Sequence, residues 1–174
     1  MDFRDSPAEA DFRSRLRAWL TERAGTFPAA GDDEYWARQG EWHQALYAGG
    51  FFGASWPREY GGQELPPVYD VIVDEELAAA GAPPRPSLGY LVVGLGRHAS
   101  AELQQRFLPG MIDGTQRWCQ GFSEPEAGSD LASLRTTARR VGDGSKDWVV
   151  NGQKVWTSGA HYSDYGIVLV RTNP

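Results

Sequence analysis

Cysteine and histidine are scarce in this chain of 174 residues. The single cysteine, Cys119, excludes an internal disulfide and any zinc site built on cysteines. The three histidines, His43, His98 and His161, are widely separated, and no two of them have the spacing of a metal-binding motif. We therefore expect no metal site.

Lysine is also rare, because only two of the 17 basic residues are lysines and the rest are arginines. We attribute this bias to genomic base composition, as in a GC-rich bacterium. The formal net charge is −6, whereas a protein that binds nucleic acid normally has a basic face. The charge therefore argues against nucleic acid as a partner.

Long apolar runs are absent. No stretch approaches the roughly 18 residues that a membrane-spanning helix needs, and no charged-then-apolar leader begins the chain. We therefore expect a cytoplasmic protein without a membrane span. Apolar residues still make up 41% of the sequence and include seven tryptophans, enough for a sizeable buried core.

Helical patterns occupy the first two thirds of the sequence. Ser6 and Glu9 have the spacing of a capping box, and Pro7 stands where the first turn of a helix tolerates proline. We expect Ser87 to cap an apolar helix that lies centrally in the core. We expect Pro109 to follow the last helix and to start a turn that ends at Gly114. The predicted helices span residues 6–24, 33–48, 66–80, 87–95 and 100–107.

The pattern changes from helical to strand periodicity at about Thr115. Asn151-Gly152 between two β-rich runs predicts a hairpin. The predicted strands span residues 117–122, 136–141, 147–150, 153–157 and 165–171. The fold class is therefore α+β, with an all-α domain over residues 1–114 and the start of an antiparallel β-barrel-like domain over 115–174. The chain stops just after a strand, and an open sheet edge favours aggregation, so we expect it to be a fragment.

The stretch 118–130 begins as an apolar run and then becomes a loop of small and turn-forming residues. Pro125 fixes its own backbone angle, and Gly128 allows a ligand to approach the main chain. Ser123 and Ser129 add short polar side chains beside that backbone. Such a loop can hold the polar part of a cofactor, although a plain surface turn after a strand is the alternative.

Trp156 provides a flat aromatic surface on a predicted strand. An aromatic side chain of this kind stacks on a flat heteroaromatic ring, while main-chain amides and hydroxyl groups bind the edge of that ring. The combination fits a flavin without requiring one. For Trp156 alone, packing in the core or on the sheet surface is favoured over contact with a ligand.

Two motifs resemble the acyl-CoA dehydrogenase family. The run 121–130, Gly-Phe-Ser-Glu-Pro-Glu-Ala-Gly-Ser-Asp, resembles the signature loop of that family. The run 150–159, Val-Asn-Gly-Gln-Lys-Val-Trp-Thr-Ser-Gly, resembles its second flavin-contacting strand. A weaker likeness lies in residues 51–62. The resemblance implies the family's helical N-terminal domain and the first part of its middle β domain, with the C-terminal domain outside this chain.

The resemblance also implies FAD as the cofactor. Ser129 is expected to touch the acyl-CoA as well, Ser158 stands where the family usually has threonine, and Gln120 stands where many members have an aromatic residue. Asp130 is expected to order the loop. The residues expected to bind FAD are Gln120, Phe122, Ser123, Gly128, Ser129, Trp156, Thr157 and Ser158.

The implied reaction is the α,β-dehydrogenation of an acyl-CoA thioester in fatty acid or lipid metabolism. The implied partners are an electron acceptor like electron-transfer flavoprotein and further subunits in a homo- or hetero-tetramer. The family's catalytic base is a glutamate in the C-terminal domain, so we expect no catalytic residue here and no activity from this chain alone. Two alternatives stay open: a flavin monooxygenase or oxidase on the same fold, and a non-catalytic partner subunit of a heteromeric dehydrogenase.

Overall fold

The computed structural model describes residues 4–28, 33–142 and 144–173. The chain divides into two compact units, Met1–Gln116 and Arg117–Pro174. Each unit has its own secondary structure and is described by itself.

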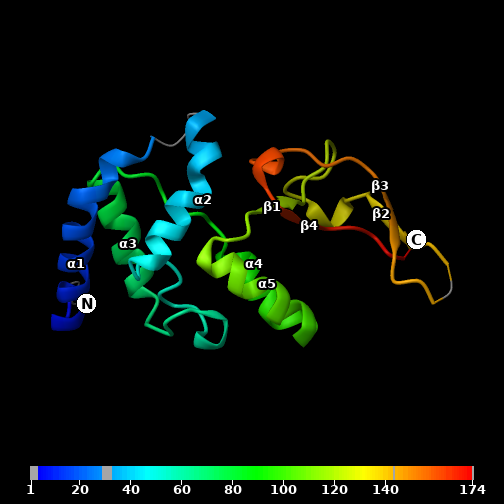
Figure 1. The fold of residues 1–174 in the computed structure, drawn as a ribbon. Helices are drawn as coiled ribbons and strands as arrows, with labels where there is room; N and C mark the ends of the chain where they lie inside the picture. Colours follow the sequence, from blue (N-terminus) through cyan, green and yellow to red (C-terminus); the bar gives the residue numbers. More distant parts are fainter. Residues whose placement is uncertain (1–3, 29–32, 143, 174) are drawn as a thin grey trace. The chain divides into compact units, whose positions relative to one another are not determined.

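The first unit is helical (Figure 1). Its helix α1 begins with the predicted capping box, in which the Ser6 N–H donates to Glu9 Oε2 at 2.6 Å and the Glu9 N–H donates to Ser6 Oγ at 3.4 Å. The predicted ranges of the first three helices are confirmed to within a few residues. The helices are α1 (Pro7–Arg23), α2 (Asp33–Ala48), α3 (Val68–Ala79), α4 (Gly89–His98) and α5 (Ala101–Asp113).

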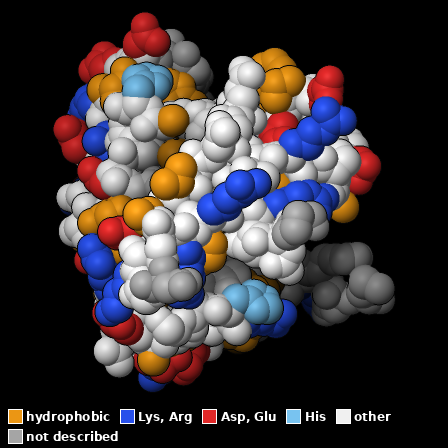
Figure 2. Space-filling model, turned by 90° about the vertical axis from the view of Figure 1, so that its right-hand side faces the viewer, with side chains coloured by type: hydrophobic (Ala, Val, Ile, Leu, Met, Phe, Trp, Pro, Cys, Tyr) orange, Lys and Arg blue, Asp and Glu red, His pale blue; other side chains and the backbone are white. Residues whose placement is uncertain are grey.

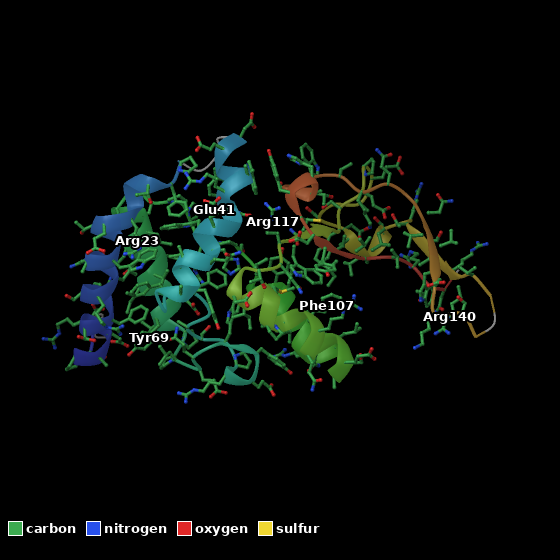
Figure 3. The ribbon with its side chains drawn as sticks, in the orientation of Figure 1. Arg23, Glu41, Tyr69, Phe107, Arg117 and Arg140 are labelled. Atoms are coloured by element: carbon green, nitrogen blue, oxygen red, sulfur yellow. The ribbon has the colours of Figure 1, made fainter. Side chains whose placement is uncertain are left out.

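The core of this unit lies where α1, α2, α3 and the end of α5 bury their apolar faces. Phe12 of α1 packs edge-on against Tyr69 of α3, with ring centroids 5.0 Å apart (Figure 3). Buried Glu76 of α3 accepts hydrogen bonds from Arg13 at 2.8 Å and from Arg17 at 2.6 Å, so charged groups also join α1 to α3. The fully buried side chains include Leu16, Trp42, Leu46, Phe52, Ile72, Val73 and Leu77.

Helix α5 contradicts the prediction that the last helix ends near residue 107. It runs through Pro109 to Asp113, and Gly114 closes it with a left-handed φ of 80°. Proline removes one backbone hydrogen bond of the helix. Burial explains why the helix continues nevertheless, because Leu108, Met111 and Ile112 are fully buried and each contributes about 1.5–3 kcal/mol.

Helix α4 also differs from its prediction. Leu88, and not Ser87, occupies the N-cap position, and no side chain caps the helix. Two of its apolar residues are buried, but Tyr90 is 46% exposed and Val93 is 50% exposed. The helix is therefore peripheral within this unit, because one side of its apolar surface is not covered by the unit's other helices.

The second unit contains two short strand pairs within its described residues. The strands are β1 (Trp118–Gly121), β2 (Thr137–Arg140), β3 (Trp148–Asn151) and β4 (Tyr165–Val168). Strands β2 and β3 pair antiparallel, whereas β1 and β4 pair parallel, which the sequence did not indicate. The α+β class is confirmed, with small sheets that do not close. On the face drawn in Figure 2, hydrophobic side chains reach the surface among charged ones of both signs.

The predicted Asn151-Gly152 hairpin is wrong. In the described structure, residues 153–157 form no strand, and β3 pairs with β2 instead. Gly152 packs so closely against Thr136 that an added Cβ would clash with the threonine side chain. The following residues run to the loop after β1, where the Val155 N–H donates to the Ser123 carbonyl oxygen at 2.9 Å.

Candidate functional site

The loop after β1 and the segment after β3 meet within the second unit. Lys154 joins them, because its Nζ donates to the Phe122 carbonyl oxygen at 2.9 Å and to Glu124 Oε1 at 2.8 Å. The Val155 backbone adds the bond to Ser123. These three bonds place Phe122 and Ser123 beside the residues that lead to Trp156, so parts of both motifs come together.

Glu124 is the centre of this junction. Its buried carboxylate also accepts the backbone N–H groups of Arg135 at 2.6 Å and of Thr136 at 2.9 Å. Lys154 first, and then these donors, hold the pKa of the Glu124 carboxyl well below its usual range. The carboxylate therefore stays charged and fully engaged, which makes it a structural anchor and unsuitable as a general base.

The loop that follows is closed on itself. Glu124 and Ala127 exchange two backbone hydrogen bonds, of 2.8 and 3.1 Å, around a tight turn. Further on, the Asp130 carbonyl oxygen accepts from both the N–H and the hydroxyl of Ser133, at 3.1 and 2.8 Å. Asp130 thus helps to order the loop through its main chain, while Ser129 between the two turns stays exposed.

Trp156 has an unusual backbone and an unusual exposure. Its φ is 58°, in the left-handed region that large side chains rarely adopt, and its side chain is 86% exposed. The Ser158 N–H donates back to the Trp156 carbonyl oxygen at 2.9 Å and closes a tight turn. An exposed indole on a strained backbone adds little to the stability of this unit. Features of this kind gather where proteins bind ligands.

The remaining expected site residues lie at different depths. Thr157 is half-buried and Ser158 is exposed beside Trp156, and Gln120 is exposed on β1 opposite Ile167. Gly128 and Ser129 are exposed, and among the described residues no hydrogen bond links them to residues 154–158.

Sequence reasoning missed Glu124 and Lys154 as the residues that join the two motifs. One signal was available, because Lys154 is one of only two lysines in an arginine-rich chain. Lysine at a position where arginine is otherwise preferred indicates a site that needs a compact ammonium group.

The groups of this site are suited to binding a ligand. It presents one flat aromatic face, hydroxyl groups on Ser123, Thr157 and Ser158, and backbone N–H groups of an exposed turn. Within the described ranges, no three His, Cys, Asp or Glu side chains are placed to hold a metal ion. None of the helices in the described part of the chain is long and apolar enough to cross a membrane.

Comparisons with known proteins agree with this geometry. The family model for the N-terminal domain of acyl-CoA dehydrogenase matches residues 6–115, and the model for the middle domain of acyl-CoA dehydrogenase matches residues 119–174.

Individual relatives give the same result. Acyl-CoA dehydrogenase IpdE1 of Mycolicibacterium smegmatis is 41% identical over 180 residues, which cover 93% of this chain and 46% of that protein. The crystal structure of the ChsE4–ChsE5 complex from Mycobacterium tuberculosis has a TM-score of 0.82 at 35% identity and covers 100% of this chain and 44% of that one. A glutaryl-CoA dehydrogenase from Mycobacterium smegmatis in complex with FADH2 has a TM-score of 0.74 at 26% identity and covers 97% of this chain and 44% of that one.

The chain spans about half the length of these relatives. Two family models, end to end, cover nearly all of it. The resemblance read from the two motifs is confirmed, and this chain belongs to the acyl-CoA dehydrogenase family.

Proposed function

We propose that this chain is the N-terminal and middle portion of an FAD-dependent enzyme that dehydrogenates an acyl-CoA thioester between its α and β carbons. The observation that carries this proposal is the exposed indole of Trp156, which directly follows Lys154 and Val155, the two residues that bond to Phe122 and Ser123. The FADH2-bound relative supports the cofactor.

The aromatic and hydroxyl groups of the site suit a flavin. The indole of Trp156 offers a stacking face, and the Thr157 and Ser158 hydroxyls lie next to it in the chain. Phe122 and Ser123 would also contact the cofactor. By the family resemblance, Gln120, Gly128 and Ser129 would also contact FAD, and Ser129 would touch the acyl-CoA. When bound, FAD supplies the acceptor for the hydride that leaves the β carbon.

The residues of this chain bind and orient the cofactor and cover it from water. We assign the α proton to none of them, and the buried Glu124 carboxylate already accepts three hydrogen bonds. We assign that proton to the family's C-terminal glutamate, outside these 174 residues. The proposed electron acceptor of the complete protein is one like electron-transfer flavoprotein.

Assembly with further subunits is part of the proposal. The ChsE4–ChsE5 relative is a complex, and this supports a homo- or hetero-tetramer for the complete protein. The same observation supports the second candidate, a partner subunit that lacks its own activity.

The test compares this chain with the longest natural chain that contains it. Each chain is purified in two ways, by itself and together with any subunit that co-purifies. We expect a visible flavin absorbance band and turnover of acyl-CoA with an artificial electron acceptor for the longer chain, and no turnover for the 174 residues alone. A flavin band that belongs to a co-purifying subunit only would favour the partner-subunit function. Absence of flavin from every preparation would contradict both candidates, because each of them places FAD in the assembled protein.

A further inference from the structure

The loop that follows β1 returns to the sheet at Thr136, and its two ends are joined there. The Thr136 N–H donates to Glu124 Oε1 at 2.9 Å, and the Thr136 carbonyl oxygen accepts from the Arg171 N–H at 2.8 Å. The Arg171 carbonyl oxygen in turn accepts from the Ala138 N–H at 2.8 Å. Arg171 therefore lies beside the start of β2 in a fixed register, and Thr136 connects it to Glu124.

The side chain of Arg171 holds the last part of this loop. Its Nε donates to the Leu134 carbonyl oxygen at 2.7 Å, and its Nη2 donates to the Ala132 carbonyl oxygen. These carbonyl groups belong to the short 3-10 helix Leu131–Ser133 and to the residue that ends it. Because a guanidinium carries its N–H groups in a rigid planar fork, the two bonds fix both the position and the orientation of this turn.

Glu124 fixes the loop from its other end. Its carboxylate accepts the backbone N–H groups of Arg135 and Thr136, and its main chain closes the tight turn with Ala127. A carboxylate thus binds N–H groups of the loop, while the guanidinium of Arg171 binds carbonyl groups of the same loop. Charge-assisted hydrogen bonds are roughly twice as strong as those between neutral groups, so both ends of the loop are firmly held.

Ser129 lies in the short span between these two fixed points. The turn that ends at Ala127 precedes it by two residues, and the helix Leu131–Ser133 begins two residues after it. Gly128 restricts the backbone little, so this span keeps its position only while both of its ends are held. The side chain of Ser129 is exposed, and its hydroxyl group can therefore reach a ligand.

We propose that Arg171 is a positioning residue of the acyl-CoA site. Its guanidinium does not touch the substrate, but it fixes the position at which the Ser129 hydroxyl group meets the acyl-CoA. The proposal rests on the proposed acyl-CoA function and adds to it a residue that lies outside both motifs.

The test measures kcat and KM of the complete flavin-loaded protein with an artificial electron acceptor. Butanoyl-CoA, octanoyl-CoA and cyclohexylpropanoyl-CoA serve as probes, and the probe with the highest kcat/KM is used for every variant. We expect Arg171→Met to raise KM about tenfold, the effect of one lost hydrogen bond, and to change kcat less than about twofold. This split is expected because the contact of Ser129 contributes to substrate binding and not to the chemical step.

Two further variants separate the geometry of Arg171 from its charge. Arg171→Lys keeps the charge but lacks the planar fork, so its KM should lie between that of the unaltered protein and that of Arg171→Met. The control is Arg139→Met, which removes the same charge from an exposed side chain of β2. Its KM should stay within about twofold of the unaltered value, because general attraction to the phosphates of CoA is weak at an exposed, solvated position.

A double-mutant cycle with Ser129→Ala separates positioning from a general effect on the fold. In the Ser129→Ala background the contact is already lost, so Arg171→Met should raise KM less than about twofold. If Arg171→Met does not retain flavin, Arg171→Lys replaces it in the same cycle.

Equal KM values in Arg171→Met and Arg139→Met overturn the proposal. A full tenfold rise of KM in the Ser129→Ala background also overturns it, since Arg171 then acts without Ser129. Absence of turnover with all three probes by the unaltered complete protein overturns this proposal and the proposed function together, whereas the first two results leave the proposed function standing.

Discussion

Lys154 Nζ lies 2.8 Å from Glu124 Oε1, and the two side chains are only 13% and 8% exposed. Their residues belong to the two motifs that are expected to bind FAD. A charge-assisted hydrogen bond in this setting is strong because little water competes with it. The pair therefore holds the two halves of the proposed cofactor site at a fixed separation before any cofactor arrives.

Lys154→Met should weaken FAD binding by about tenfold or more, because it leaves the Glu124 carboxylate without its cation and frees the Phe122 carbonyl group. The measurement is a fluorescence titration of the apoprotein with FAD. The matched control is Lys146→Met, which changes the only other lysine, an exposed one. Equal FAD affinity in the two variants would show that the pair has no part in positioning the site.

His43 should make stability depend on pH. Burial lowers its pKa from 6.5 to about 4, while its Nε2 lies 3.0 Å from the Ile112 carbonyl oxygen. The unfolded chain takes up a proton near pH 6.5 and the folded chain does not, so stability is complete above pH 6.5 and is lost as pH falls towards 4. The difference corresponds to about 3 kcal/mol.

Urea unfolding at several pH values measures this loss. In His43→Gln the slope of stability between pH 6.5 and 4 should become shallower, whereas His98→Gln, at an exposed histidine, should keep it. An unchanged slope in the His43 variant would refute a role for this residue.

Glu76 should contribute strongly to the stability of the helical unit. It accepts from Arg13 and from Arg17, and its side chain is 6% exposed. Glu76→Gln leaves these cations poorly matched and should lower the free energy of unfolding by roughly 2–4 kcal/mol. Glu75→Gln is the control, since Glu75 also accepts from Arg13 but is 58% exposed, and its loss should be below about 1 kcal/mol. Similar losses in both variants would mean that burial does not strengthen the Glu76 contacts.

Local signals accounted for most of the helices. The capping box of Ser6 and Glu9 acts within a few residues of the helix end that it defines, so a single sequence contains the necessary information. The continuation of α5 through Pro109 was not predictable in this way. It depends on the burial of Leu108 and Met111 among residues that are distant in sequence.

In the β unit and the site, local signals were again readable from the sequence, whereas contacts between distant residues were not. Asn151-Gly152 is a strong local turn signal, but β3 pairs with β2, and Val155 bonds to the loop after β1 instead of returning along β3. The motif loops could be located from the resemblance, whereas the Lys154–Glu124 pair spans 30 residues and no local pattern links its members. Contacts of this kind follow from the packed structure alone.

The central claim is that the exposed indole of Trp156 is a cofactor surface, and FAD titration of Trp156→Ala in the complete protein tests it most directly. The control is Trp148→Ala on β3, where the ring is 45% exposed and lies under the Arg140 guanidinium. Trp156→Ala should keep stability within about 0.5 kcal/mol, because the side chain is exposed, yet weaken FAD binding at least tenfold. Trp148→Ala should leave FAD affinity unchanged. Undiminished affinity in Trp156→Ala would contradict the account.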